Sequence, residues 1–120
     1  MVKVLIVDDA AFMRLAIRRM LEGNGFQVIG EAENGKEGVR KYFELKPDVV
    51  TMDITMPEVG GVEALKAIIQ RDPKAKVIMC SAMGQEIMVK EAVLAGAKSF
   101  IVKPFKEEHV VQTINKIISV

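Results

Sequence analysis

The stretch that decides the fold runs from Pro47 to Pro57 and reads PDVVTMDITMP. Pro47 and Asp48 are typical of a turn, and the mostly apolar run 49–52 predicts a strand buried on both faces of a parallel sheet. Asp53 stands where this run ends, before a proline that stops the strand. Because ligands of open α/β sheets bind beyond the carboxyl ends of strands, Asp53 is a candidate site residue. The alternative is an Asp that only caps a loop.

The rest of the chain repeats this pattern of an apolar run followed by an amphipathic segment. The sequence predicts strands at 2–7, 26–32, 49–52, 77–81 and 99–102, and helices at 11–22, 35–45, 61–72, 85–95 and 107–119. Five strand–helix units are too few for a closed eight-stranded barrel, which needs about 250 residues. We therefore expect residues 1–120 to form one α/β domain, a doubly wound parallel five-stranded sheet of strand order 2-1-3-4-5.

Composition narrows the classes of function. Half of the 120 residues are hydrophobic, and 17 basic residues balance 16 acidic ones to a net charge of +1. This balance gives no electrostatic reason to expect a nucleic-acid partner. Cys80 is the only cysteine, so no internal disulfide can form, and we expect a buried thiol. The amino terminus resembles neither a signal peptide nor a membrane span, and we expect a cytoplasmic monomer without a membrane partner.

Two acids follow the first predicted strand, as Asp53 follows the third. The predicted strand order puts these strands side by side, so Asp8, Asp9 and Asp53 should meet at one edge of the sheet. Carboxylates this close repel one another unless a cation lies between them. Their hard oxygen atoms favour Mg²⁺, with Mn²⁺ as the other choice. The alternative is that Asp8 and Asp9 cap the first helix.

The fourth and fifth predicted strands end in Ser81 and Lys103. Taken singly, a serine can cap a turn and a lysine at a strand end is commonly solvated. At one edge with the acids, however, they complete a set of a carboxylate nucleophile, a divalent cation, a hydroxyl donor and a fixed positive charge. These are the groups that receive a phosphoryl group and balance its charge.

Four motifs carry a family resemblance over the whole length: LIVDDAAF, MDITMP, CSAMG and KPF. Their order and spacing resemble those of response-regulator receiver domains, which have a flavodoxin-like fold, and most closely the single-domain receivers of chemotaxis. The resemblance implies that Asp53 is the phosphoacceptor and that Ser81 and Lys103 bind the phosphoryl oxygens. It further implies that Mg²⁺ is held by Asp8, Asp9, Asp53 and the backbone carbonyl of Thr55. A cis peptide bond between Lys103 and Pro104 is also implied.

The resemblance also implies partners and an output surface. A histidine kinase would be the phosphodonor. The other partners would be a phosphatase and an output protein such as a flagellar switch component. The residue that maps onto the family's switch aromatic is Phe100, which lacks the hydroxyl of the usual tyrosine, so a rotamer switch here would depend on packing alone. The predicted contact patch comprises Phe100, Ile87, Val89, Val93 and Leu94. The alternative for the fourth helix is that it is simply buried.

Three other interpretations remain open from the sequence. The chain is also compatible with a receiver domain excised from a larger response regulator. A flavodoxin-like binding protein would share the fold, but Asp8 and Asp9 would repel its phosphate ligand unless a metal were present. A small phosphohydrolase of the haloacid dehalogenase kind also uses an aspartate nucleophile, but its nucleophile normally ends the first strand. Flavin absorbance and repeated turnover of phosphomonoesters, respectively, would distinguish these classes.

Overall fold

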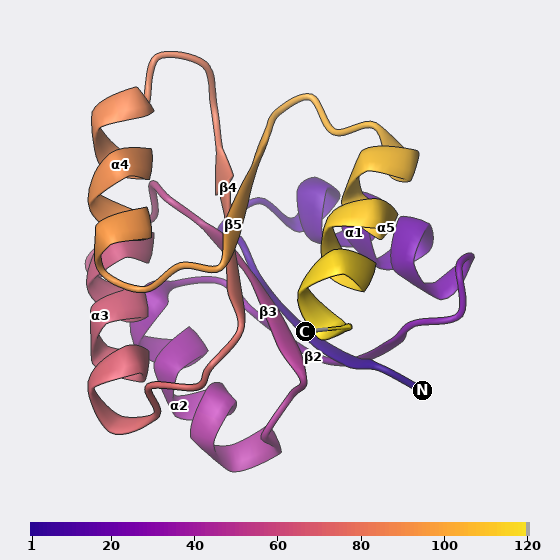
Figure 1. Ribbon diagram of the computed structural model, residues 1–120, viewed down its shortest axis with the longest axis horizontal. Coiled ribbons are helices and arrows are strands. Elements are labelled where there is room, and N and C mark those ends of the chain that lie inside the picture. The colour runs from indigo at the N-terminus through magenta and orange to yellow at the C-terminus, as the bar shows by residue number, and fades with distance from the viewer. Residues whose placement is uncertain (120) are drawn as a thin grey trace.

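Strands and helices alternate along residues 1–119, the part of the chain that the computed structural model describes (Figure 1). Val120, the last residue of the predicted domain, lies outside the described residues. The strands are β1 (Lys3–Val7), β2 (Gln27–Ala32), β3 (Val49–Asp53), β4 (Val77–Ser81) and β5 (Ser99–Val102). The helices are α1 (Ala11–Glu22), α2 (Gly35–Leu45), α3 (Gly61–Arg71), α4 (Glu86–Leu94) and α5 (Glu107–Ile118).

The five strands form one parallel sheet in the order β2-β1-β3-β4-β5, which confirms the predicted fold class and strand order. The register places Val7 beside Met52 on the neighbouring strand β3, and Asp53 beside Cys80 on β4. Ser81 lies beside Val102 on the edge strand β5. The carboxyl ends of four strands therefore finish at nearly the same level.

Helices cover both faces of the sheet (Figure 1). Helices α1 and α5 pack on one face, and α2, α3 and α4 pack on the other. Alternate strand residues supply the two cores: Leu5 packs on the side of α3, whereas Ile6 packs on the side of α1 and α5. This alternation follows from the two-residue period of a strand buried on both faces.

Among the five helices of the described residues, α2 is the one whose start is fixed by a capping side chain. Asn34 precedes α2, and its Oδ1 accepts a hydrogen bond from the N–H of Glu37 (2.8 Å), as in a helix N-cap. Helix α4 begins at Glu86 and ends at Leu94, one residue inside the predicted range at each end. The Gln85 side chain is instead engaged by the loops before the helix.

Three other sequence-based expectations can be compared with the structure. The peptide bond between Lys103 and Pro104 is cis, as the family resemblance implied. Cys80 is buried, and this burial raises the pKa of its thiol to about 12. None of the helices within residues 1–119 is long and apolar enough to cross a membrane.

Candidate functional site

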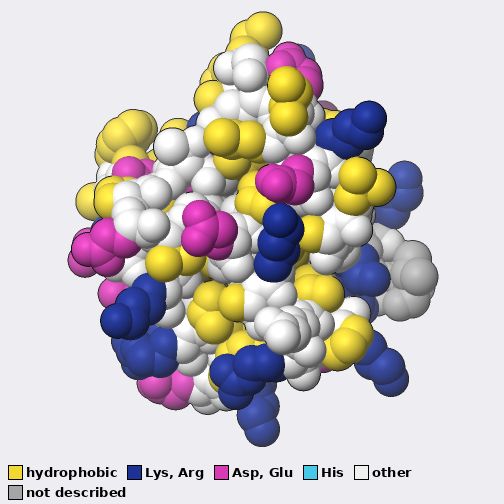
Figure 2. All heavy atoms as spheres, turned by 90° about the vertical axis from the view of Figure 1, so that its left-hand side faces the viewer, with side chains coloured by type: hydrophobic (Ala, Val, Ile, Leu, Met, Phe, Trp, Pro, Cys, Tyr) yellow, Lys and Arg dark blue, Asp and Glu magenta, His cyan; other side chains and the backbone are white. Residues whose placement is uncertain are grey.

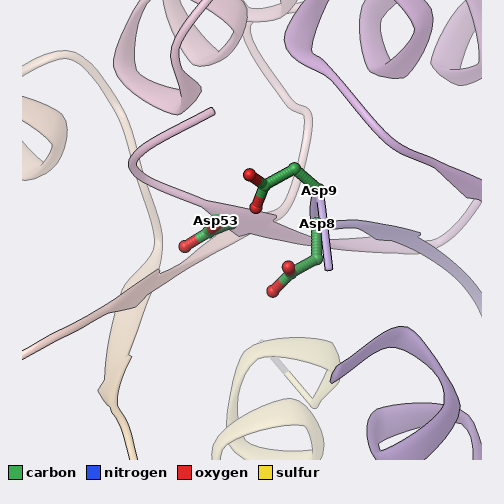
Figure 3. Close-up of side chains that lie close together, drawn as sticks. All are labelled: Asp8, Asp9 and Asp53. Carbon is green, nitrogen blue, oxygen red and sulfur yellow. The ribbon is translucent and has the colours of Figure 1, made fainter. Parts of the chain in front are cut away.

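Three carboxylates converge at the carboxyl edge of the sheet (Figure 3). Asp8 and Asp9 follow β1, and Asp53 is the last residue of β3, the strand that pairs with β1. One oxygen atom from each carboxylate lies within 4.8 Å of the others. Asp8 and Asp53 are buried, whereas Asp9 is exposed to solvent. The predicted convergence of the three acids is confirmed.

Lys103 reaches the same place from the end of β5. Its Nζ donates a hydrogen bond to Oδ1 of Asp53 (3.0 Å) and lies 3.4 Å from Oδ2 of Asp8. Burial lowers the pKa of Lys103, but the hydrogen bond to Asp53 and the charges of both carboxylates outweigh this effect and raise the pKa above its ordinary value. The lysine therefore stays protonated.

The ionised form of Asp53 is disfavoured at this position. Its pKa is raised to about 6 from an ordinary value of 3.8, and burial is the largest cause. The hydrogen bond from Lys103 partly offsets this rise, and the charges of Asp8 and Asp9 add to it. At neutral pH the group is mostly ionised, but at a cost in free energy that a nearby cation would remove.

The donor set fits a divalent cation. Among the described residues, Lys103 is the one cationic side chain that forms ion pairs with this cluster, and it pairs with Asp8 and Asp53. Clustered carboxylate oxygens with one side open to water suit Mg²⁺ or Mn²⁺ better than a soft metal. Thr55 lies in the exposed loop after β3, and the role of its carbonyl as a ligand stays a prediction.

The backbone around Asp53 is held by close packing. The N–H of Gly61 at the start of α3 donates to the carbonyl of Ile54 (2.7 Å). A Cβ atom at Gly61 would lie 2.0 Å from the carbonyl oxygen of Asp53, so a glycine is required for this close approach. On the other strand, the Asp8 carboxylate accepts from the N–H of Ala10 (2.9 Å). Both acidic loops are thus fixed by local contacts.

Ser81 is the remaining predicted member of the site. It is buried at the end of β4, one residue beyond Cys80, which lies opposite Asp53. The N–H of Lys103 donates to the Ser81 carbonyl (2.7 Å), so the backbones of these two residues are directly joined. The structure therefore brings Ser81 and Lys103 to the edge that carries the acids.

Sequence reasoning missed an arginine–glutamate cluster beside the site. Arg14 of α1 donates from Nη1 to the carbonyl of Asp8 (2.7 Å) and from Nε to Glu31 of β2 (3.0 Å). Arg18, one turn further along α1, also binds Glu31. The four-residue spacing of the two arginines is visible in the sequence, but their shared partner, Glu31, lies on a strand that is distant in sequence. This cluster supports the backbone that presents Asp8.

The predicted contact patch lies on the face that carries α4 (Figure 2). Ile87 and Leu94 are 87% and 79% exposed, and Val93 and Phe100 are exposed as well, which is unusual for large apolar side chains. Val89 is half-buried and packs against the core. The alternative of a fully buried fourth helix is therefore wrong.

A groove joins this patch to the site. It has a volume of about 510 Å³ and runs between the β4–α4 loop, α4 and β5. Ser81 lines one part of the groove and Phe100 another. A movement of Ser81 at the end of β4 would therefore change the shape of the groove that Phe100 also lines.

A parallel flavodoxin-like sheet with an acidic cluster, a serine and a lysine at its carboxyl edge has the architecture of a phosphoacceptor signalling domain. The family model "Response regulator receiver domain" matches residues 4–115, and the chain belongs to this family. It is a CheY-like receiver of chemotaxis two-component signalling, as its similarity to the relatives described next shows.

The relatives are similar over nearly their whole length. The chain is 60% identical to the chemotaxis protein CheY of Thermotoga maritima, covering 96% of both chains. It is 59% identical to CheY of Bacillus subtilis, covering 98% of both. Among solved structures, the CheX-CheY-BeF3-Mg²⁺ complex from Borrelia burgdorferi matches with a TM-score of 0.92 and 41% identity, covering 97% of this chain and 88% of that one.

Proposed function

We propose that Asp53 accepts a phosphoryl group from the phosphohistidine of a histidine kinase. The observation that carries this proposal is the position of the Asp53 carboxylate, 3.0 Å from the Lys103 ammonium and grouped with Asp8 and Asp9. An ionised carboxylate beside fixed positive charge is a suitable nucleophile for phosphoryl transfer.

The transfer would proceed in line. A carboxylate oxygen of Asp53 attacks phosphorus as the phosphorus–nitrogen bond breaks, and the imidazole of the kinase leaves with the bonding electron pair. The Lys103 ammonium and the Ser81 hydroxyl then bind phosphoryl oxygens. Asp8, Asp9, Asp53 and the Thr55 carbonyl would hold Mg²⁺, which supplies charge neutralisation at the transferring group. Hydrolysis of the acyl phosphate by the same residues would reset the protein slowly.

The phosphorylated state would change affinity for partner proteins through α4, β5 and α5. Phosphorylation can only shift an existing equilibrium, here toward a state in which Ser81 and Lys103 close on the phosphate. The groove from Ser81 to Phe100 supports this route. The Borrelia burgdorferi complex, in which a CheY is bound to CheX, supports protein partners for this chain. We propose a kinase, a phosphatase and a flagellar switch component as these partners.

We also propose that residues 1–120 act as a single receiver domain in the cytoplasm. The match of the family model to residues 4–115 supports the domain assignment. The cytoplasmic location stays a prediction.

Incubation with a small phosphodonor such as acetyl phosphate tests the proposed function. We expect one phosphoryl group per chain by intact mass with Mg²⁺ present, and none with a chelator or in Asp53→Asn. Asp48→Asn is the matched control, because Asp48 lies before β3, where its carboxylate accepts from the N–H of Lys3. Undiminished incorporation in Asp53→Asn would contradict the proposal. Repeated turnover of phosphomonoesters would instead favour a phosphohydrolase.

A further inference from the structure

One side chain links the two loops that follow β3 and β4. Gln85 donates from Nε2 to the hydroxyl of Thr55 and accepts at Oε1 from the N–H of Ala82, both at 2.6 Å. Thr55 lies two residues after Asp53, and Ala82 directly follows Ser81. Gln85 thus joins the loop next to the phosphoacceptor to the loop next to the phosphate-binding hydroxyl.

The Ala82 N–H moves with Ser81. The peptide bond between these two residues is planar, so the carbonyl of Ser81 and the N–H of Ala82 rotate as one unit. Among the described residues, Lys103 is the side chain that hydrogen-bonds the Asp53 carboxylate, and no hydrogen bond joins the Ser81 hydroxyl to it. Movement of Ser81 toward a phosphoryl group on Asp53 would therefore displace the Ala82 N–H from the position in which Gln85 holds it.

Few other contacts hold this loop. Ala82 and Met83 are exposed, the latter by 84%, and a Cβ atom at Gly84 would meet no other atom within 4 Å. The helix that follows has one buried residue, Ala92. Because the loop between β4 and α4 makes few packing contacts, the two hydrogen bonds of Gln85 supply a large part of what holds it in place.

From these contacts we propose that Gln85 is a positioning residue that holds the Ser81–Ala82 segment in the unphosphorylated arrangement and so opposes the switch. This inference rests on the proposed function, because it assumes that Ser81 moves to a phosphoryl group on Asp53. It adds a residue outside the phosphoryl site that sets how readily the loop closes. Loss of the Gln85 side chain would ease closure.

The first experiment uses the protein without metal or phosphate. Deuterium exchange of the Ala82 amide, followed by NMR, should be about threefold to tenfold faster in Gln85→Ala than in wild type. Gln70→Ala is the matched control, because Gln70 is exposed on α3 and makes no side-chain hydrogen bond among the described residues. Thr55→Ser should keep wild-type exchange, since it retains the hydroxyl. Unchanged exchange in Gln85→Ala would overturn the restraint itself.

The second experiment measures the switch with beryllofluoride, a phosphate mimic, in the presence of Mg²⁺. The apparent affinity should rise about threefold to tenfold in Gln85→Ala and stay unchanged in Gln70→Ala. Equal or weaker binding by Gln85→Ala, with normal binding by wild type, would overturn this inference alone. Failure of wild type to bind beryllofluoride would overturn the proposed function together with it.

Discussion

At the scale of single residues, the proposed role of Asp53 and its buried position favour different protonation states of its carboxyl group. Its carboxylate must be ionised to act as a nucleophile, yet burial raises its pKa to about 6. Lys103 offsets only part of this penalty, because Asp8 and Asp9 bring further negative charge to the same place. The proposed function would explain this arrangement, because a bound cation would offset the cost in stability that the clustered negative charges impose.

Asp53→Asn should accordingly stabilise the metal-free protein. Since the folded pKa lies above the ordinary value of 3.8, ionisation of Asp53 costs stability as the pH rises from about 4 through 6. The variant should gain on the order of 2 kcal/mol in the free energy of unfolding at pH 8 and little at pH 4. Urea unfolding at both pH values in a chelator measures this. A gain that does not depend on pH would contradict the electrostatic explanation.

The buried hydroxyl of Thr51 is a second feature that lowers the stability of the fold. It lies between Ile6 and Ile78 in the sheet and is 2% exposed. Its hydroxyl has no hydrogen-bond partner among the described residues. Burial of an unpaired hydroxyl is unfavourable, and valine has nearly the same shape.

Thr51→Val should therefore raise the free energy of unfolding by about 1 kcal/mol. Chemical denaturation of both proteins checks this value. The matched control is Thr113→Val on α5, where the hydroxyl donates to the carbonyl of His109 at an exposed site and little change is expected. A loss of stability in Thr51→Val alone would mean that the hydroxyl has a partner in solution.

At the scale of elements, the helices differ in how firmly they are packed. Helix α3 buries Gly61, Ala64, Leu65 and Ile68, whereas α4 buries only Ala92 among its residues. The apolar side chains of α4 point largely to solvent. An element with few buried contacts has a low free energy of local opening and is suited to movement in a switch.

Amide exchange should reveal this difference. We expect the amides of α4 to exchange at least about tenfold faster than those of α3 under native conditions, because opening α4 exposes less apolar surface. Hydrogen–deuterium exchange resolved by NMR measures both helices in one sample. Equal protection of the two helices would contradict the packing argument.

The start of α3 depends on the absence of a side chain at Gly61. In Gly61→Ala the new Cβ would lie 2.0 Å from the Asp53 carbonyl oxygen, so the end of β3 must shift. We expect a loss of about 3 kcal/mol in the free energy of unfolding, together with weaker phosphorylation. Gly60→Ala is the control, because its Cβ would lie 3.4 Å from the nearest atom. A similar small effect of both variants would show that the turn relaxes easily.

The sequence predicted the elements more completely than the loops between them. The apolar runs specify the strands most clearly in the middle of the sheet, where a strand is buried on both faces, as in Val49–Asp53. Helix ends were displaced where a tertiary contact decides them, as at Gln85, whose side chain binds two loops. Such contacts join residues distant in sequence, and no local pattern encodes them.

At the scale of the whole molecule, one parallel sheet brings distant residues together. Asp8, Asp53, Ser81 and Lys103 each stand at or just after the carboxyl end of a strand, and parallel pairing in a fixed register puts these ends at one edge. The topology, rather than any local motif, therefore creates the site. For this reason the acids, serine and lysine could be predicted from strand ends alone.

The supporting residues could not be found in this way. Glu31 lies within a strand and pairs with two arginines of α1. Burial raises its pKa, but the hydrogen bonds and charges of Arg18 and Arg14 together lower it below the ordinary value. Its role depends on how α1 packs across the sheet edge. Such packing is a property of the assembled fold, and the positions of the strand ends in the sequence do not predict it.

The position of the phosphoryl group on the chain decides whether Asp53 is the phosphoacceptor. After reaction with acetyl phosphate and Mg²⁺, borohydride reduction of the acyl phosphate and peptide mass spectrometry identify the modified carboxyl group. We expect a single modified residue, Asp53, at the end of β3. Modification of Asp8, Asp9 or a residue away from this edge of the sheet would contradict it.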